Sequence, residues 1–256
     1  MTLLAADIIA KFYGFLWPLT RIAAALMTVP VISIEAANAR IRIILAIALT
    51  LLVYPLHDWP TIDPISARGL SALLHEIAIG VMTGLTLQVV TAALVVAGQS
   101  ISTAMGLSMS NLLDPSLGNV PVLSQFLVIT GTMIFLGIGG PTMLVSILLD
   151  SFTLLPVGQS LIDLTAIANL LRWSSMMFLG ALLISLPVVA SLLLINVGLG
   201  VVTRAAPSLN IFAVGFPAMI VAGFLLLLVS MGGIVHRIQW LWLQGFDKVR
   251  ELLGIG

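Results

Sequence analysis

The sequence contains no cysteine and little charge. None of its 256 residues is cysteine, which excludes disulfide bonds, thiol catalysis and cysteine-ligated metals. Charged residues make up only 8% of the chain, whereas soluble domains carry about 25%. The ten basic and ten acidic residues give a formal net charge of zero. This balance offers no basic surface of the kind that binds nucleic acid.

Histidines and catalytic motifs are also scarce. His57, His75 and His236 lie in three separate places, so a histidine metal centre is not expected. His75-Glu76 could begin the His-Glu-x-x-His motif of zinc proteases, but position 79 is Ile79. The chain also lacks a P-loop, a Gly-x-Ser-x-Gly elbow and a Gly-x-Gly-x-x-Gly fingerprint. We therefore predict a protein that is not an enzyme and that has no metal or cofactor.

Apolar residues are abundant. Hydrophobic residues make up 60% of the chain and the mean hydropathy is +1.22. A soluble fold could not bury this much apolar surface, so a membrane or a large hydrophobic assembly must solvate it. Most apolar segments reach the ~20 residues that cross a bilayer as a helix. We predict an all-α membrane protein with about six long apolar helical segments, at residues 8–33, 41–57, 70–98, 122–149, 173–200 and 211–236.

Prolines interrupt several of these segments. Some segments are longer than a straight span requires, which indicates tilted, kinked or broken helices. Proline lacks the backbone N–H that continues a helix, and the freed groups at membrane depth must be satisfied by protein or water. We predict helix breaks at Pro18, Pro30, Pro141, Pro187 and Pro217.

Charges outside the segments indicate the domain organisation. If all six segments span, basic residues are more frequent on the side that carries both termini, which places the termini in the cytoplasm. Residues 237–253 look amphipathic and are expected to lie at an interface or on a partner. We predict one integral membrane domain over residues 1–236, followed by an amphipathic C-terminal segment over residues 237–256.

Arg21 and Glu76 lie inside apolar segments. An ionisable residue within a membrane is costly and faces protein or water rather than lipid. The two residues could contact each other or line a polar conduit. Alternatively, each could reach the membrane surface or pair structurally with a neighbouring subunit. Close by, Gly80 and Gly84 form a Gly-x-x-x-Gly pattern that lets two helices approach closely, so we expect a packing role for them.

Residues 99–121 form a connector that is rich in Gly, Ser, Met and Asn and has a single charge. Its glycines and prolines disfavour an uninterrupted helix. Irregular backbone at membrane depth must line water or be covered by protein, so the composition fits a re-entrant or cavity-filling segment. An ordinary exposed loop is the alternative. The candidate residues are Met105, Gly106, Leu107, Ser108, Met109, Ser110, Asn111, Asp114, Pro115 and Gly118.

Residues 203–217 interrupt the last two apolar segments with two prolines, a glycine and one arginine. A plain membrane anchor needs no such interruption. We expect a turn and helix packing from Arg204, Pro207, Asn210, Phe212, Gly215 and Pro217.

Many short motifs follow one another along nearly the whole chain. They include Trp17-Pro18, Arg21, Pro30, Arg40, Glu76, Ile79-Gly80, Gly84, Ala97-Gly98, Met105-Gly106-Leu107-Ser108, Asp114-Pro115, Leu149-Asp150-Ser151-Phe152, Leu155-Pro156-Val157-Gly158, Asn196, Arg204, Ala206-Pro207, Leu209-Asn210-Ile211-Phe212 and Gly215-Phe216-Pro217. Their order and spacing resemble the FliR family of flagellar and type III secretion export-gate proteins. One departure is Gln99, where family members often carry an acidic residue. A role that needs a charge at that position is not expected here.

The resemblance implies a noncatalytic subunit that joins FliP and FliQ in the core of the export gate, with FlhB and FlhA nearby. Unfolded flagellar subunits would pass through this gate. The segment matching Gly106 to Pro121 would plug the pore at rest. The resemblance also implies kinked helical hairpins in a hetero-oligomer of the bacterial inner membrane and flagellar basal body, in contact with lipid. Much of the core would lie above the membrane plane, on the periplasmic side.

Two other functions stay open at this point. A small-molecule or ion permease could use Arg21, Glu76 and broken helices as a midplane binding site. The lack of a repeated half and the few intramembrane charges disfavour it. Within the family, a virulence secretion subunit is the alternative, because both branches share these motifs.

Overall fold

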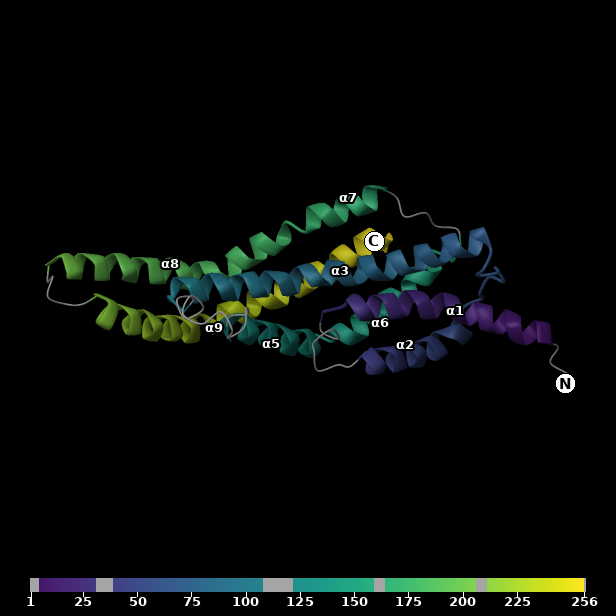
Figure 1. Ribbon diagram of the computed structural model, residues 1–256, viewed down its shortest axis with the longest axis horizontal. Helices are drawn as coiled ribbons and strands as arrows, with labels where there is room; N and C mark the ends of the chain where they lie inside the picture. Colours follow the sequence, from purple (N-terminus) through teal and green to yellow (C-terminus); the bar gives the residue numbers. More distant parts are fainter. Residues whose placement is uncertain (1–4, 31–38, 108–121, 159–163, 206–210, 256) are drawn as a thin grey trace. The chain divides into compact units, whose positions relative to one another are not determined.

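A computed structural model describes residues 5–30, 39–107, 122–158, 164–205 and 211–255, and the described residues form helices and no strand (Figure 1). This confirms the prediction of an all-α membrane protein. The elements are α1 (Ala5–Thr28), α2 (Ala39–Val53), the 3-10 helix η1 (Tyr54–Leu56), α3 (Ala67–Ala104), α5 (Val122–Gly137), α6 (Gly140–Leu154), α7 (Leu164–Trp173), α8 (Met176–Ala205) and α9 (Ile211–Leu253).

The helices differ in extent from the predicted segments. Helices α3 and α9 are 38 and 43 residues long, because their buried apolar positions continue at helical spacing beyond the predicted ends. In α9, Ile238, Trp242 and Phe246 are buried past residue 236. The predicted C-terminal segment is therefore continuous with the last apolar segment up to Leu253. Residues 164–172, which lie between two predicted apolar segments, form α7 together with Trp173.

Two of the five predicted proline breaks coincide with helix ends. Pro141 lies in the first turn of α6, directly after the break that ends α5 at Gly137. Pro30 follows the end of α1. The prediction of a break is wrong at the other three positions, because a proline removes one backbone hydrogen bond, and the turns on either side of it still form. The helices continue through Pro18, Pro187 and Pro217.

Fewer than six of the described helices have the length and composition of a membrane span. Three qualify, at Ala67–Ala104, Thr165–Arg204 and Gly215–Leu253. A fourth is possible if the bent pair of α5 and α6 counts as one span. Helix α2, with 15 residues, is too short to cross a bilayer. The predicted apolar segments are therefore helical, but by length and composition only three or four of the described helices are candidates to span a membrane.

The chain divides into two compact units. Unit 1 comprises Met1–Val89, Gly139–Ser174 and Gln244–Gly256, and unit 2 comprises Val90–Ile138 and Ser175–Leu243. In unit 1, α1 packs beside α2 (Figure 1), and Trp17, Ala72 and Val157 form a buried cluster. In unit 2, α8 and the first part of α9 run antiparallel (Figure 1). The core of unit 2 includes Leu94, Phe135, Ile184, Ile238 and Trp242.

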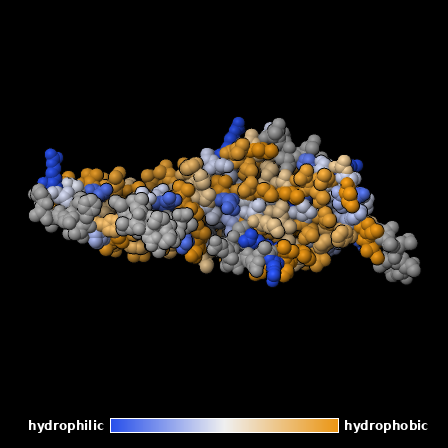
Figure 2. All heavy atoms as spheres, in the orientation of Figure 1, coloured by the Kyte–Doolittle hydropathy of each residue, from blue (hydrophilic) through white to orange (hydrophobic). Residues whose placement is uncertain are grey.

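Large apolar side chains also remain exposed on both units. Figure 2 shows hydrophobic residues over much of the visible surface. Leu194, Leu228 and Val229 of unit 2 are 74%, 73% and 85% exposed, and Ile44 of unit 1 is 66% exposed. Apolar surface on this scale requires lipid or partner subunits to cover it.

Candidate functional site

Unit 1 contains a buried ion pair between α1 and α3. The Arg21 Nε donates to Glu76 Oε2 at 2.7 Å, and Arg21 Nη2 donates to Glu76 Oε1 at 3.0 Å. Both side chains are 0% exposed. The two parallel bonds match the planar fork of a guanidinium to a carboxylate, which is the strongest geometry for such a pair. The structure thus brings together the two charges that the sequence predicts inside apolar segments.

The remaining guanidinium hydrogens bind the end of α6. Arg21 Nη1 donates to Ser151 O at 2.8 Å and to Ser151 Oγ at 3.0 Å, and Arg21 Nη2 donates to Leu155 O at 2.8 Å. The guanidinium carbon lies 4.3 Å from the ring centroid of Phe152. All five guanidinium hydrogens therefore have acceptors. Ser151 O also accepts from the Leu155 N–H at 2.9 Å, whereas Leu155 O lies just past the last turn of α6, where carbonyls lack intrahelical donors. The C-terminus of a helix also attracts a cation, so α6 is well suited to receive Arg21.

This arrangement fastens three helices at one point. Arg21 comes from α1, Glu76 from α3, and Ser151 from α6. Both charges are enclosed, so neither lines an open passage in the described part of unit 1. Chemically, the site can neutralise charge and fix helix positions.

The Gly-x-x-x-Gly pattern lies at the contact between α1 and α3. A Cβ added to Gly80 would collide with the Arg21 carbonyl oxygen and with Ala24. A Cβ added to Gly84 would collide with Thr28. The two glycines allow the helix backbones to approach, as small residues do in membrane helix pairs. This close approach of α1 and α3 allows Arg21 and Glu76 to form their hydrogen bonds.

In unit 2, α3 ends at the start of the predicted plug. Gly106 has a φ of +80°, its N–H donates to Thr103 O at 3.0 Å, and the Leu107 N–H donates to Ser102 O at 3.0 Å. This pair of bonds around a left-handed glycine is a Schellman motif, which terminates a helix and turns the chain away. The turn fixes where the plug-like segment leaves α3.

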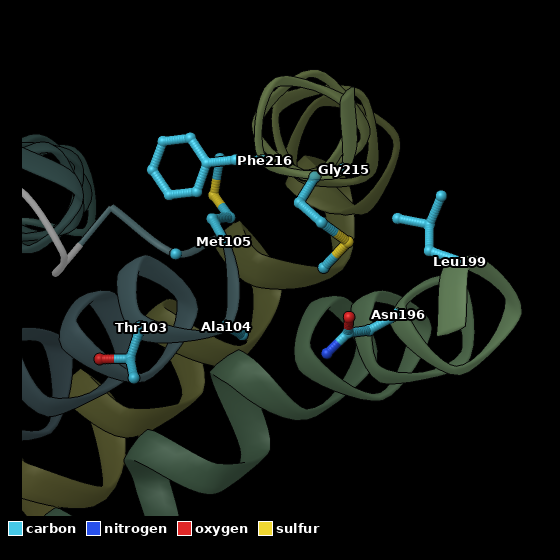
Figure 3. A pocket seen from close by; sticks show the side chains of 9 residues that line it. Thr103, Ala104, Met105, Asn196, Leu199, Gly215 and Phe216 are labelled. Carbon is cyan, nitrogen blue, oxygen red and sulfur yellow. The ribbon is translucent and has the colours of Figure 1, made fainter. Parts of the chain in front are cut away.

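A cavity of about 330 Å³ lies beside this turn. Figure 3 shows Met105 and Phe216 next to each other, with Asn196 and Leu199 contributed by α8. Met105 is 0% exposed, and its flexible thioether chain fills the space opposite Gly223 of α9. The cavity joins the start of the predicted plug to the predicted hairpin motif, because Met105, Gly106 and Gly215 all line it.

The other predicted residues have different positions. Arg204 is exposed in the last turn of α8, and Pro217 is an exposed residue inside α9. Phe212 lies in α9, but its side chain is outside the described part. The remaining predicted residues are outside the described residues altogether: Ser108, Met109, Ser110, Asn111, Asp114, Pro115, Gly118, Pro207 and Asn210.

Sequence reasoning missed the partners of Arg21 on α6. Ser151, Phe152 and Leu155 appear in the sequence only as parts of short motifs, and nothing in those motifs indicates that they contact Arg21. The sequence held only an indirect indication of these partners. An arginine in an apolar helix needs hydrogen-bond acceptors, and the C-terminal end of a neighbouring helix can supply carbonyls. Among the described residues, no three histidine, aspartate or glutamate side chains lie close enough to hold a metal ion.

Comparison with known proteins gives a consistent family. Residues 12–245 match the family described as bacterial export proteins, family 1. The flagellar biosynthetic protein FliR of Pectobacterium carotovorum is 35% identical, over 96% of this chain and 95% of that protein. FliR of Escherichia coli K12 is 31% identical, over 93% and 92%. FliR of Bacillus subtilis 168 is 30% identical, over 97% and 98%. The chain therefore belongs to the bacterial export proteins, family 1, the family of the flagellar biosynthetic protein FliR.

Proposed function

We propose that this chain is a noncatalytic subunit of the flagellar type III protein export gate. The observation that carries the proposal is the family match over residues 12–245, together with FliR relatives that align along almost their full length. Family and relatives make the chain a membrane component of the flagellar export apparatus. The finer role, as part of the channel wall through which unfolded flagellar subunits pass, is our inference.

The geometry supports a structural rather than a chemical role. The charged side chains in the core of unit 1 bind one another and a helix end, so they hold helices in place. The apolar helices expose large side chains that need lipid or partner subunits as cover. We infer that FliP-like and FliQ-like subunits provide much of this cover. FlhB-like and FlhA-like proteins would lie nearby, in the basal body of the inner membrane.

We further propose that residues 99–121 close the pore until substrate engages. Residues 99–104 of this segment belong to α3, and the Schellman turn at Gly106, which ends the helix and redirects the chain, supports the proposal for the residues that follow. Met105 and Gly106 line a cavity with α8 and α9, so this turn is held by the hairpin of unit 2.

The test of the proposed function is genetic. Deleting the gene in its own bacterium should abolish secretion of flagellar filament protein into the medium, and a plasmid copy should restore it. Unchanged flagellar secretion would contradict the proposal. Loss of virulence secretion with intact flagella would assign the chain to the other branch of the family. Loss of uptake of a small solute, with secretion intact, would support the permease.

The plug has a separate test. Complexes that carry a deletion of residues 107–117 should conduct ions or small solutes when reconstituted in liposomes, because the segment that closes the pore is gone. The wild-type complex in the same liposomes is the control and should stay closed. A deletion variant that assembles fully and remains as tight as the wild type would refute the plug role.

A further inference from the structure

Helix α8 contains a proline whose missing donor frees one carbonyl. Pro187 lies inside α8 and has no backbone N–H. In a regular helix, that N–H would bind the carbonyl four residues earlier, which belongs to Leu183. The segment Thr165–Arg204 qualifies as a membrane span. A carbonyl without a donor is costly in that environment, because lipid offers no hydrogen bonds.

Arg237 of α9 binds this carbonyl. Its Nη1 donates to Leu183 O at 2.8 Å. The sequence placed Arg237 just after the last apolar segment, but the structure places it in the interior of the 43-residue α9. A guanidinium has five donors and no acceptor, so it can serve a carbonyl that the backbone leaves unpaired. The charged side chain thus stands where the Pro187 N–H is missing.

The packing of α8 on α9 brings these groups together. One turn before Leu183, a Cβ on Gly180 would lie 3.0 Å from both methyl carbons of Leu241. Ile184 and Ile238, the neighbours of Leu183 and Arg237, are both 0% exposed. The two helices therefore run antiparallel in close contact at this level. The hydrogen bond lies at the exposed edge of this contact, because Leu183 is exposed and Arg237 is half-buried.

Unit 2 gives Arg237 no described carboxylate to pair with. The one acidic residue in its sequence ranges is Asp114, which lies outside the described residues. An arginine in an apolar helix is otherwise costly. In the described part of unit 2, Arg237 instead donates a hydrogen bond to the Leu183 carbonyl, which Pro187 leaves without a backbone donor.

We propose that Arg237 is a positioning residue that replaces the hydrogen-bond donor missing at Pro187 and thereby fixes α9 against α8. The bond sets the relative position of the two helices that also line the cavity beside Met105, through Asn196 of α8 and Phe216 of α9. A role in export rests on the proposed function. The hydrogen bond and its link to Pro187 are independent of the proposed function.

The test is a double-mutant cycle with Arg237→Met and Pro187→Ala. Arg237→Met alone should lower the thermal midpoint of the purified protein by about 5 °C, because the Leu183 carbonyl loses its donor. In the Pro187→Ala background, the alanine N–H can bind that carbonyl. Arg237→Met should then lower the midpoint by less than half as much. Arg68→Met, at an exposed position in the first turn of α3, is the matched control and should change neither background.

An equal effect of Arg237→Met in both backgrounds would overturn the proposal, and so would no effect in either. If Arg237→Met alone does not accumulate, Pro187→Ala should restore its yield, and failure to do so also counts against the proposal. Export of filament protein by the same variants provides a separate readout. Suppose that the effect of Arg237→Met on the midpoint depends on Pro187, but that the strain lacking the gene still exports filament protein normally. That result would contradict the proposed function and leave this inference intact.

Discussion

The two units of the chain satisfy the polar groups of their apolar helices in different ways. Unit 1 concentrates charge in one enclosed pair, where Arg21 meets Glu76 and the end of α6. Unit 2 has no acidic side chain in its described part. There, polar side chains donate to main-chain carbonyls of other helices: Arg237 to Leu183, Trp242 to Gly131 and Ser124 to Val95.

This contrast indicates that the two units differ in rigidity. A bidentate ion pair with every donor used holds three helices in one geometry, because any shift leaves a buried charge unpaired. Single hydrogen bonds to carbonyls leave more freedom, and Met105 adds a compliant contact next to the plug-like segment. We infer that unit 1 is the more rigid of the two, and that unit 2 carries the start of the segment that we propose as the plug.

The largest expected effect is at the ion pair of unit 1. Arg21→Met leaves the Glu76 carboxylate buried and unpaired, which should cost about 3–5 kcal/mol of stability. The free energy of unfolding in mixed detergent micelles measures this cost. Arg68→Met, at an exposed position of the same helix as Glu76, is the control and should change stability little.

A second variant distinguishes a missing charge partner from a missing contact. Adding Glu76→Met to Arg21→Met removes the unpaired carboxylate, so the double variant should be more stable than Arg21→Met alone. If Arg21→Met costs no more than Arg237→Met in unit 2, the contrast between the two units is wrong.

An intermediate effect separates the glycines of the two units. In unit 1, a Cβ on Gly80 would meet backbone atoms of α1, which cannot move aside, so Gly80→Ala should cost about 1–3 kcal/mol. In unit 2, the atoms nearest to a Cβ on Gly223 belong to the side chain of Met105, and a flexible thioether chain shifts more easily than backbone. Gly223→Ala should therefore cost less than Gly80→Ala in the same unfolding measurement. The reverse order would show that unit 2 is the more tightly packed of the two.

The smallest effect is at two matched helix ends. Gly106 and Gly254 have φ values of +80° and +72° and end their helices with the same pair of hydrogen bonds. Alanine at either position should cost about 1 kcal/mol from the left-handed backbone. Gly106 also faces the Phe216 ring, whereas nothing lies near Gly254. The Gly106→Ala variant should therefore have a lower thermal midpoint than the Gly254→Ala variant. Equal midpoints would mean that the contact with Phe216 does not affect stability.

The sequence predicted the helical class well because apolar runs of this length have few alternatives in a membrane. It placed helix ends less well. Residues 164–173 carry Asn169 and Arg172 among apolar residues and resembled a connector, yet they form α7. Arg237 was placed at the start of a separate amphipathic segment, yet it lies in the interior of α9. A polar residue marks a helix end only if no neighbouring helix supplies its partner.

The candidate site could be predicted only in part. Two charges in apolar segments indicated that partners must exist, but Arg21 and Glu76 are 55 residues apart, and their third partner, Ser151, is 130 residues from Arg21. Contacts between residues this far apart in the sequence depend on how the helices pack, and local sequence patterns do not specify that packing. The plug residues from Ser108 to Gly118 stay a prediction that rests on the family resemblance.

The most direct test of the central claim is the intact mass of the complex formed when this chain is coexpressed with its FliP-like and FliQ-like neighbours and purified in mild detergent. We predict one defined complex that contains all three proteins, because the exposed apolar helices need partner subunits as cover. A chain that stays alone, folded and monodisperse would contradict the account.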